Sequence, residues 1–212
     1  MFGVYRLRFA SPQTGLIRSM LQLGAPFTKS EVVAAFTRQY EAVHDFFAQI
    51  AVEPFFTAPA GIWSPAENLV HLIKSCAPVI MALNMPKTML RIRFGWVGHE
   101  SRTLAQVRYT YVQDALGSGG QAGGPFVPEV KADFSASHQN AVLSKWMDKG
   151  TELHASLEKW SDKDLDSYLL PHPLLGKMTV REILFFTLYH NLHHVNDVQR
   201  LLGQPESEWF AE

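Results

Sequence analysis

Four long segments of this chain carry apolar side chains at spacings of three and four residues. At 100° per residue, this spacing gathers the apolar positions into one stripe along a helix. Such a helix buries its stripe against other elements, so four of them favour helices packed around one shared core. The sequence therefore predicts an all-α fold, with helices over residues 31–51, 65–84, 137–160 and 180–202.

Start and stop signals delimit these helices. Ser64 suits an N-cap, Pro65 suits the first helical position, and Glu67 completes a capping box with Ser64. Pro86 ends this second helix near residue 84, and Gly203 follows the last helix as a C-terminal glycine. Equivalent capping pairs open the first and last helices: Thr28 with Glu31, and Thr179 with Glu182.

The second and third helices are separated by about fifty residues without one clear period. A shorter helix is predicted over residues 102–116, followed by the glycine-rich loop 117–128. The segment SDKDLDSYLLPHPLLGKM, residues 161–178, reads as a loop with solvated aspartates, and no segment alternates like a strand. These features predict a four-helix bundle with a long crossover between helices two and three.

The predicted bundle covers residues 28–205, between a poorly ordered N-terminal extension, 1–27, and a C-terminal tail, 206–212.

The formal net charge of −1 gives no basic field, so we expect no nucleic-acid partner. No run reaches the roughly 18 apolar residues of a membrane span, so we expect no membrane partner. Cys76 is the only cysteine, which excludes an intrachain disulfide and a cysteine-based zinc site. The N-terminus lacks the features of a secretory signal, so a cytoplasmic protein is expected.

Three of the nine histidines stand close together in the last predicted helix. On a helical projection, His194 and His190 lie about 30° and 70° from the centre of the apolar face, and His193 lies about 130° away. A lone inward histidine is usually a hydrogen-bonded core residue. However, residues at i and i+4 are about 6 Å apart at Cβ, so the pair His190 and His194 can reach one metal ion.

Two ligands rarely suffice for a metal, and the third must come from another helix. His71, His44 and His154 each lie at the edge of an apolar stripe on the other three helices. Spacing alone does not choose among them.

Two motifs provide a resemblance to a known family. WSPAENLVHL, residues 63–72, resembles the W-S-x-x-E-x-x-x-H-L signature of the DinB/YfiT-like superfamily. YHNLHHVNDVQRLL, residues 189–202, is similar to the H-x-x-H-H segment near the end of that family's last helix, and residues 171–190 resemble the approach to it. The resemblance spans about residues 28–203. Where many members continue with Arg-Gly-Gln, this chain has Val195-Asn196-Asp197.

The resemblance implies a four-helix bundle with the same crossover and selects the metal ligands. Carried over, they are His71, His190 and His194, with His193 beside them. Three imidazoles leave open positions on a divalent ion; zinc is the first expectation, and nickel and iron also suit imidazole. Characterised relatives include transferases and isomerases that use a low-molecular-weight thiol. We therefore expect a metal-dependent thiol transferase, or a hydrolase, that acts on a small-molecule substrate.

A second interpretation is a non-catalytic bundle with a structural or sensing metal and a partner-binding surface. We also expect a homodimer. Cys76 lies in an apolar stripe and is interpreted as a buried, inert thiol. Trp63 is interpreted as a helix-start anchor that packs inward, and His172 as a turn residue.

Overall fold

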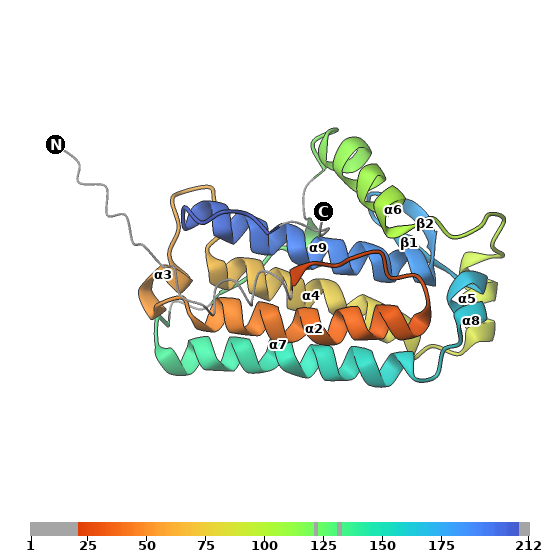
Figure 1. The fold of residues 1–212 in the computed structure, drawn as a ribbon, viewed down its shortest axis with the longest axis horizontal. Helices are drawn as coiled ribbons and strands as arrows, with labels where there is room; N and C mark the ends of the chain where they lie inside the picture. Colours follow the sequence, from red (N-terminus) through yellow and green to blue (C-terminus); the bar gives the residue numbers. More distant parts are fainter. Residues whose placement is uncertain (1–20, 121–122, 131–132, 208–212) are drawn as a thin grey trace.

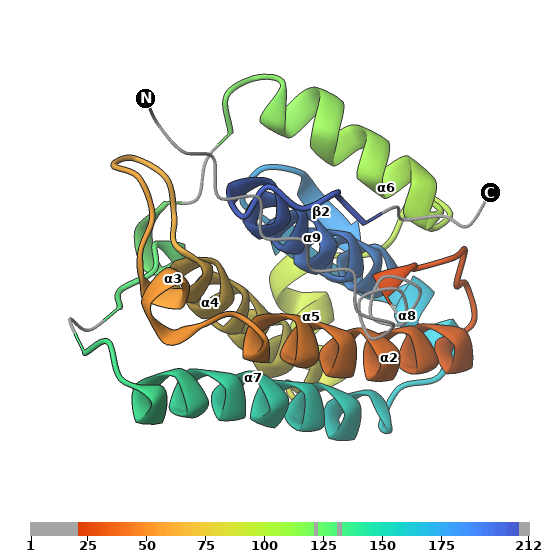
Figure 2. The same ribbon diagram turned by 60° about the vertical axis from the view of Figure 1, so that its left-hand side comes forward.

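The computed structural model describes residues 21–207 except 121–122 and 131–132. Four long helices lie side by side with roughly aligned axes (Figures 1 and 2). They are α2 (Lys29–Ala48), α4 (Pro65–Leu83), α7 (Ala136–Leu157) and α9 (Val180–Leu201). Both α2 and α4 pack against α7 and α9, so the order around the bundle is α2, α7, α4, α9. The predicted all-α bundle is confirmed, and each predicted helix end lies within three residues of the observed one.

The predicted capping boxes are present at the starts of α2, α4 and α9. At α4, the Glu67 carboxylate accepts from the backbone N–H of Ser64 at 2.7 Å, and the Ser64 hydroxyl accepts from the N–H of Glu67 at 3.3 Å. These bonds satisfy donors that the first helical turn leaves without intrahelical partners. The start of α4, which carries His71, is therefore fixed by local sequence.

A close contact between α2 and α7 depends on a glycine. The Tyr40 ring stacks on Trp146 with ring centroids 4.2 Å apart, and the Trp146 indole N–H donates to the Tyr40 carbonyl at 3.0 Å. A Cβ atom at Gly150 would lie only 2.7 Å from the Tyr40 ring. The absence of a side chain at Gly150 therefore lets Tyr40 lie against α7.

The crossover between α4 and α7 contains several short helices. They are α5 (Lys87–Phe94), α6 (Leu104–Thr110), the π-helix η1 (Tyr111–Leu116) and the 3-10 turn η2 (Gly124–Phe126). The helix predicted over 102–116 is present as α6 and η1, which pack over α9 in Figure 2. A further short helix, α3 (Val52–Phe56), precedes α4.

The prediction of a loop over residues 161–178 is wrong. This segment forms α8 (Asp162–Ser167) and an antiparallel hairpin of β1 (Leu169–His172) and β2 (Gly176–Thr179), with Leu169 opposite Thr179. The strands have four residues each, which is too short for alternation to show in the sequence. The first two positions of β1 are both buried, so no polar residue alternates with them.

The sequence predicted that the aspartates of this segment are solvated. In the structure they bind cationic side chains instead. Arg181, whose side chain is 1% exposed, donates to Asp166 at 2.6 Å and to Asp162 at 3.1 Å, and it contacts the carbonyl of Phe27. A buried guanidinium needs acceptors for its N–H groups, and α8 supplies them. Asp164 pairs with Lys87 at 2.7 Å and so joins α8 to α5.

Two stretches flank the bundle. Leu21 and Leu23, which belong to the predicted extension, are buried against the core, and residues 1–20 lie outside the described residues. In the predicted tail, the Ser207 backbone N–H donates to Asn196 at 3.0 Å and to Gln199 at 2.9 Å. Residues 208–212 also lie outside the described part of the chain.

Helix α4 is long and apolar enough to cross a membrane by length and composition alone, with a mean hydropathy of 1.2. It packs against α7 and α9, and half of its most apolar 18-residue stretch is buried inside the protein. Core helices of compact domains meet the same criteria, and the packing of α4 identifies it as one of these.

Candidate metal centre

Three histidine side chains meet between α4 and α9. His71 comes from the first half of α4, and His190 and His194 come from successive turns of α9. The Nε2 atom of His190 lies 3.2 Å from the Nε2 atom of His71 and 3.2 Å from that of His194. All three residues are buried, with 3%, 6% and 7% of their surface exposed. The structure thus brings together the three residues that the family resemblance selects.

The outer ring nitrogens of two of these histidines have fixed partners. The Nδ1 atom of His71 lies 2.7 Å from the carbonyl oxygen of Phe126 in the crossover. The Nδ1 atom of His194 lies 2.8 Å from the side-chain oxygen of Asn68. The Asn68 amide nitrogen donates to the carbonyls of Trp63 and Ser64, so its oxygen must face His194. Because both partners are acceptors, Nδ1 carries the proton in each ring, and each Nε2 presents a lone pair.

This donor set fits a divalent metal ion. A tetrahedral ion with imidazole bonds of 2.0–2.1 Å places its ligand nitrogens about 3.3 Å apart, close to the 3.2 Å separations here. Without a cation, the single proton of a neutral His190 could face only one of its two neighbours. One cation would accept a ring nitrogen from each of the three histidines, and these three nitrogens lie within 4.8 Å of one another.

Burial keeps the three imidazoles neutral. It lowers the pKa of His71 and lowers those of His190 and His194 well below the ordinary value of 6.5. The neighbouring imidazoles oppose protonation further, because each would place a second positive charge beside the first. Neutral imidazole is the form that binds metals, so the rings are ready to act as ligands at neutral pH.

A comparison with protein families agrees with this arrangement. A family model described as the DinB superfamily matches residues 35–198 of this chain, a range that includes all three histidines. The chain belongs to the DinB superfamily. Comparisons with curated proteins and with solved structures found no match.

Aromatic side chains line this DinB-superfamily site. The ring of Trp63 lies 5.0 Å from that of His71 and stacks on His194 at 5.9 Å. Phe186 stacks on His190 at 5.0 Å, and Tyr111, the first residue of the π-helix, lies edge-on to His190 at 6.2 Å. Trp63 is therefore part of the site wall, and the sequence reading of a helix anchor gave only part of its role.

The hydroxyl of Ser75 lies beside the ring of His71. It lies 3.4 Å from the Nε2 atom of His71, one turn further along α4. The hydroxyl can donate a hydrogen bond there or to a molecule held at the centre.

His193 and His172 lie near the site without joining the cluster. The Nε2 atom of His193 faces Asp197 at 3.7 Å, on the flank of α9 where the projection placed it. The sequence predicted a turn residue at His172, but His172 is the last residue of β1; its Nδ1 atom accepts the N–H groups of Leu174 and Leu175 in the turn at 3.2 and 3.1 Å. Its ring touches Phe186 with centroids 4.2 Å apart.

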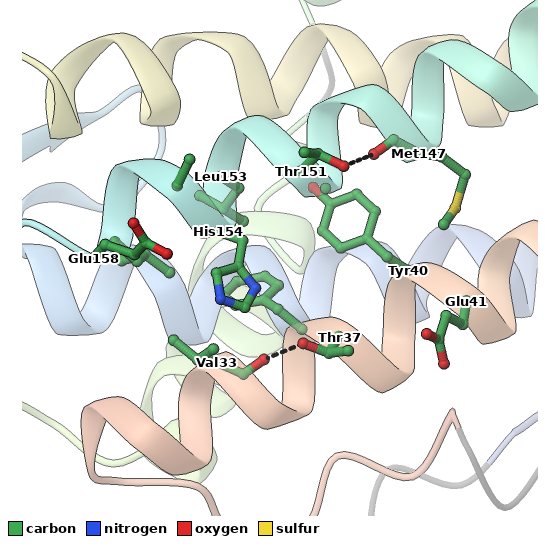
Figure 3. Close-up of a pocket in the computed structure, with 13 residues that line it drawn as sticks. Val33, Thr37, Tyr40, Glu41, Met147, Thr151, Leu153, His154 and Glu158 are labelled. Carbon is green, nitrogen blue, oxygen red and sulfur yellow. Dashed lines mark hydrogen bonds between the residues drawn. The ribbon is translucent and has the colours of Figure 1, made fainter.

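The two alternative third ligands lie elsewhere. His44 on α2 contacts its neighbour Asp45 at 3.1 Å. His154 on α7 lines a cavity of about 320 Å³ between α2 and α7, together with Tyr40 and Gly150 (Figure 3). This pair of helices lies on the opposite side of the bundle from the pair that carries the three histidines.

Cys76 is buried, as predicted, and does not belong to the cluster. Its Sγ atom lies 3.1 Å from the Tyr40 hydroxyl, and burial raises the pKa of the thiol to about 11. A thiol that stays protonated at neutral pH is a poor nucleophile and a poor ligand.

Sequence reasoning missed the groups that orient the histidines. Asn68 stands three residues before His71, inside the family motif, but the residue type alone does not identify its partner. The Phe126 contact uses a backbone carbonyl, for which no side-chain signal exists.

Proposed function

We propose that this DinB-superfamily protein binds one divalent metal ion through His71, His190 and His194, and that it acts as a metal-dependent transferase. Zinc is the first choice, and nickel or iron would suit the same ligands. The observation that carries the proposal is the convergence of three ring nitrogens, with the rings of His71 and His194 held by acceptors at their Nδ1 atoms.

A bound divalent ion would lower the pKa of a thiol or a water molecule at an open position. The residues around it would hold and shape the reactants. Ser75 would donate to, or accept from, the incoming group, and Trp63 and Phe186 would shield the centre from bulk water. The proposed reactants are a low-molecular-weight thiol and a small electrophile.

The alternative is a non-catalytic bundle in which the metal stabilises the fold or is sensed. Structural zinc sites are usually closed by four protein ligands. Within the part of the chain that the structure describes, the cluster holds three residues and no fourth His, Cys, Asp or Glu joins it. This favours a site with an open position on the metal. Because catalytic zinc sites keep such a position, it favours the interpretation as an enzyme.

Metal content tests the ligand assignment. Purified protein should bind close to one equivalent of zinc, and His71→Ala, His190→Ala and His194→Ala should each lose most of it. His193→Ala is the matched control, since this ring faces Asp197 on the flank of the same helix. Each variant must be shown to be folded by circular dichroism. Loss of metal in His193→Ala with retention in His190→Ala would overturn the assignment.

Activity is tested separately. The zinc-loaded protein should be screened with small thiols and electrophiles, with disappearance of the free thiol as the readout. Metal binding without turnover of any pair, together with a loss of folding on metal removal, would favour the structural alternative.

We also propose a cytoplasmic homodimer. The core packing of α4 supports a protein without a span formed by that helix. Light scattering coupled to size exclusion measures the oligomeric state, and a mass of 23.9 kDa at all concentrations would contradict the dimer.

A further inference from the structure

The short helix α5 presents large apolar side chains to solvent. Ile92 is 81% exposed and Met89 is 47% exposed, one turn apart, and Trp96, just after the helix, is 75% exposed. Met81, at the end of α4, is 64% exposed. We call these four residues the α5 patch. Leu90 is fully buried, so α5 is anchored on one side and free on the other.

Cationic residues lie in and beside α5. Residues 68–99 contain no Asp or Glu and four Lys or Arg, of which Arg91 and Arg93 alternate with Ile92 in α5. Two lysines from later segments approach the same region: Lys159 donates to Asn84 at 2.7 Å, and Lys177 donates to the Phe94 carbonyl at 2.8 Å.

Two acidic groups of α8, which is joined to α5 by an ion pair, have cationic partners. Asp164 binds Lys87 at 2.7 Å, and Asp166 binds Arg181 at 2.6 Å. Arg91 lies over the rings of Trp96 and Tyr168, at 4.1 and 4.6 Å from their centroids. Helix α5 itself contains three cations, Lys87, Arg91 and Arg93, and no acidic residue, so its own charge is positive.

These observations distinguish the possible partners. In a two-fold dimer through this patch, each copy would meet the same cations on the other, and like charges would repel. An anionic surface instead complements them. Exposed Trp and Ile beside Lys and Arg are the combination with which helices lie in the interface of an anionic bilayer.

We propose that the α5 patch binds the surface of an anionic lipid bilayer, with Ile92, Met89 and Trp96 inserted among the headgroups. Helix α5 lies at one end of the bundle (Figure 1). This is contact from one side and requires no spanning segment. It is also independent of the metal centre, because α5 follows the C-terminal end of α4, whereas His71 is in the first half of that helix.

The test is co-sedimentation of the whole protein with vesicles of phosphatidylcholine alone or with added phosphatidylserine. Wild-type protein should bind the anionic vesicles, bind the neutral ones far less, and dissociate as salt rises. Arg93→Gln should weaken the binding about fivefold, the value of one juxtamembrane cation. Ile92→Ser should weaken it about tenfold or more, because it removes one inserted apolar side chain.

Ile62→Ser is the matched control, since Ile62 is 55% exposed in the loop before α4 and outside the patch. It should bind the vesicles as wild type does. Equal binding by Ile92→Ser and Ile62→Ser, or no binding of wild type to anionic vesicles, would overturn the proposal. If Ile92→Ser instead converts a dimer into a monomer without vesicles, the patch is a contact between copies and the lipid proposal falls.

Discussion

Removal of the Asn68 side chain tests whether the metal centre depends on how His194 is held. The Asn68 oxygen accepts from the Nδ1 atom of His194 at 2.8 Å and so directs the Nε2 lone pair toward the other two rings. We expect Asn68→Ala to weaken zinc binding, because His194 then loses its tautomer and ring orientation.

The size of the effect follows from the surroundings of the ring. Loss of a hydrogen-bond partner behind a metal-bound histidine typically costs 10- to 100-fold in metal affinity, or about 1.4–2.7 kcal/mol. In this chain Asp197 offers a second acceptor, with its carboxylate 3.5 Å from the same Nδ1 atom. The expected loss of zinc affinity in Asn68→Ala is therefore near the lower end of that 10- to 100-fold range, about tenfold. Asn68→Ala combined with Asp197→Ala should approach 100-fold.

The assay is competition for zinc with a chromophoric chelator at fixed pH. Asn84→Ala is the matched control, because Asn84 caps the C-terminus of the same helix and also donates to the carbonyl four residues before it. Asn68 makes the same type of bond to Ser64, so the control removes an equivalent stabilising contact far from the histidines. Wild-type affinity in Asn68→Ala, or an equal loss in Asn84→Ala, would refute the reasoning.

Three further predictions concern folding and the thiol. Cys76→Ala should leave zinc content unchanged in a folded protein, and a loss of zinc measured by metal analysis would show that the thiol acts at the centre. Gly150→Ala should lower the free energy of unfolding by about 1–2 kcal/mol in urea, because a Cβ clash with Tyr40 outweighs the helix propensity gained; a more stable variant would contradict the close contact. Burial lowers the pKa of His172 to about 4, against 6.5 when unfolded, so the unfolded state takes up a proton first as pH falls. Stability should therefore fall from pH 6.5 toward 4, and His172→Asn should show a weaker fall in urea titrations at pH 7 and pH 5.

The core of the site could be predicted only with the family motif added to the helical pattern. Helical spacing placed His190 and His194 on the inward face of α9, because a regular helix fixes the angle between residues. It could not choose among His71, His44 and His154, because the rotation of one helix against another is set by packing. In the bundle, α4 turns His71 toward α9, while His154 faces the groove between α2 and α7.

The region between α7 and α9 shows where local signals end. The hairpin and α8 are held by partners remote in sequence, such as Arg181 between Asp162 and Asp166. Isolated, the segment looks like a polar loop, because its acceptors serve a guanidinium that lies in another element. The exposure of the α5 patch could not be predicted for the same reason, because an apolar run in a sequence does not reveal which of its faces the bundle covers.

The sequence by itself determined the number, ends and inward faces of the four main helices, because capping boxes and apolar stripes act within one or two turns. It also determined that the thiol of Cys76 would be buried. Only the tertiary structure decided which ring nitrogens carry protons, because the acceptors behind His71 and His194 are a carbonyl from the crossover and an amide on a different helix from His194. It alone decided that three ring nitrogens converge, since that requires two helices packed at one particular rotation.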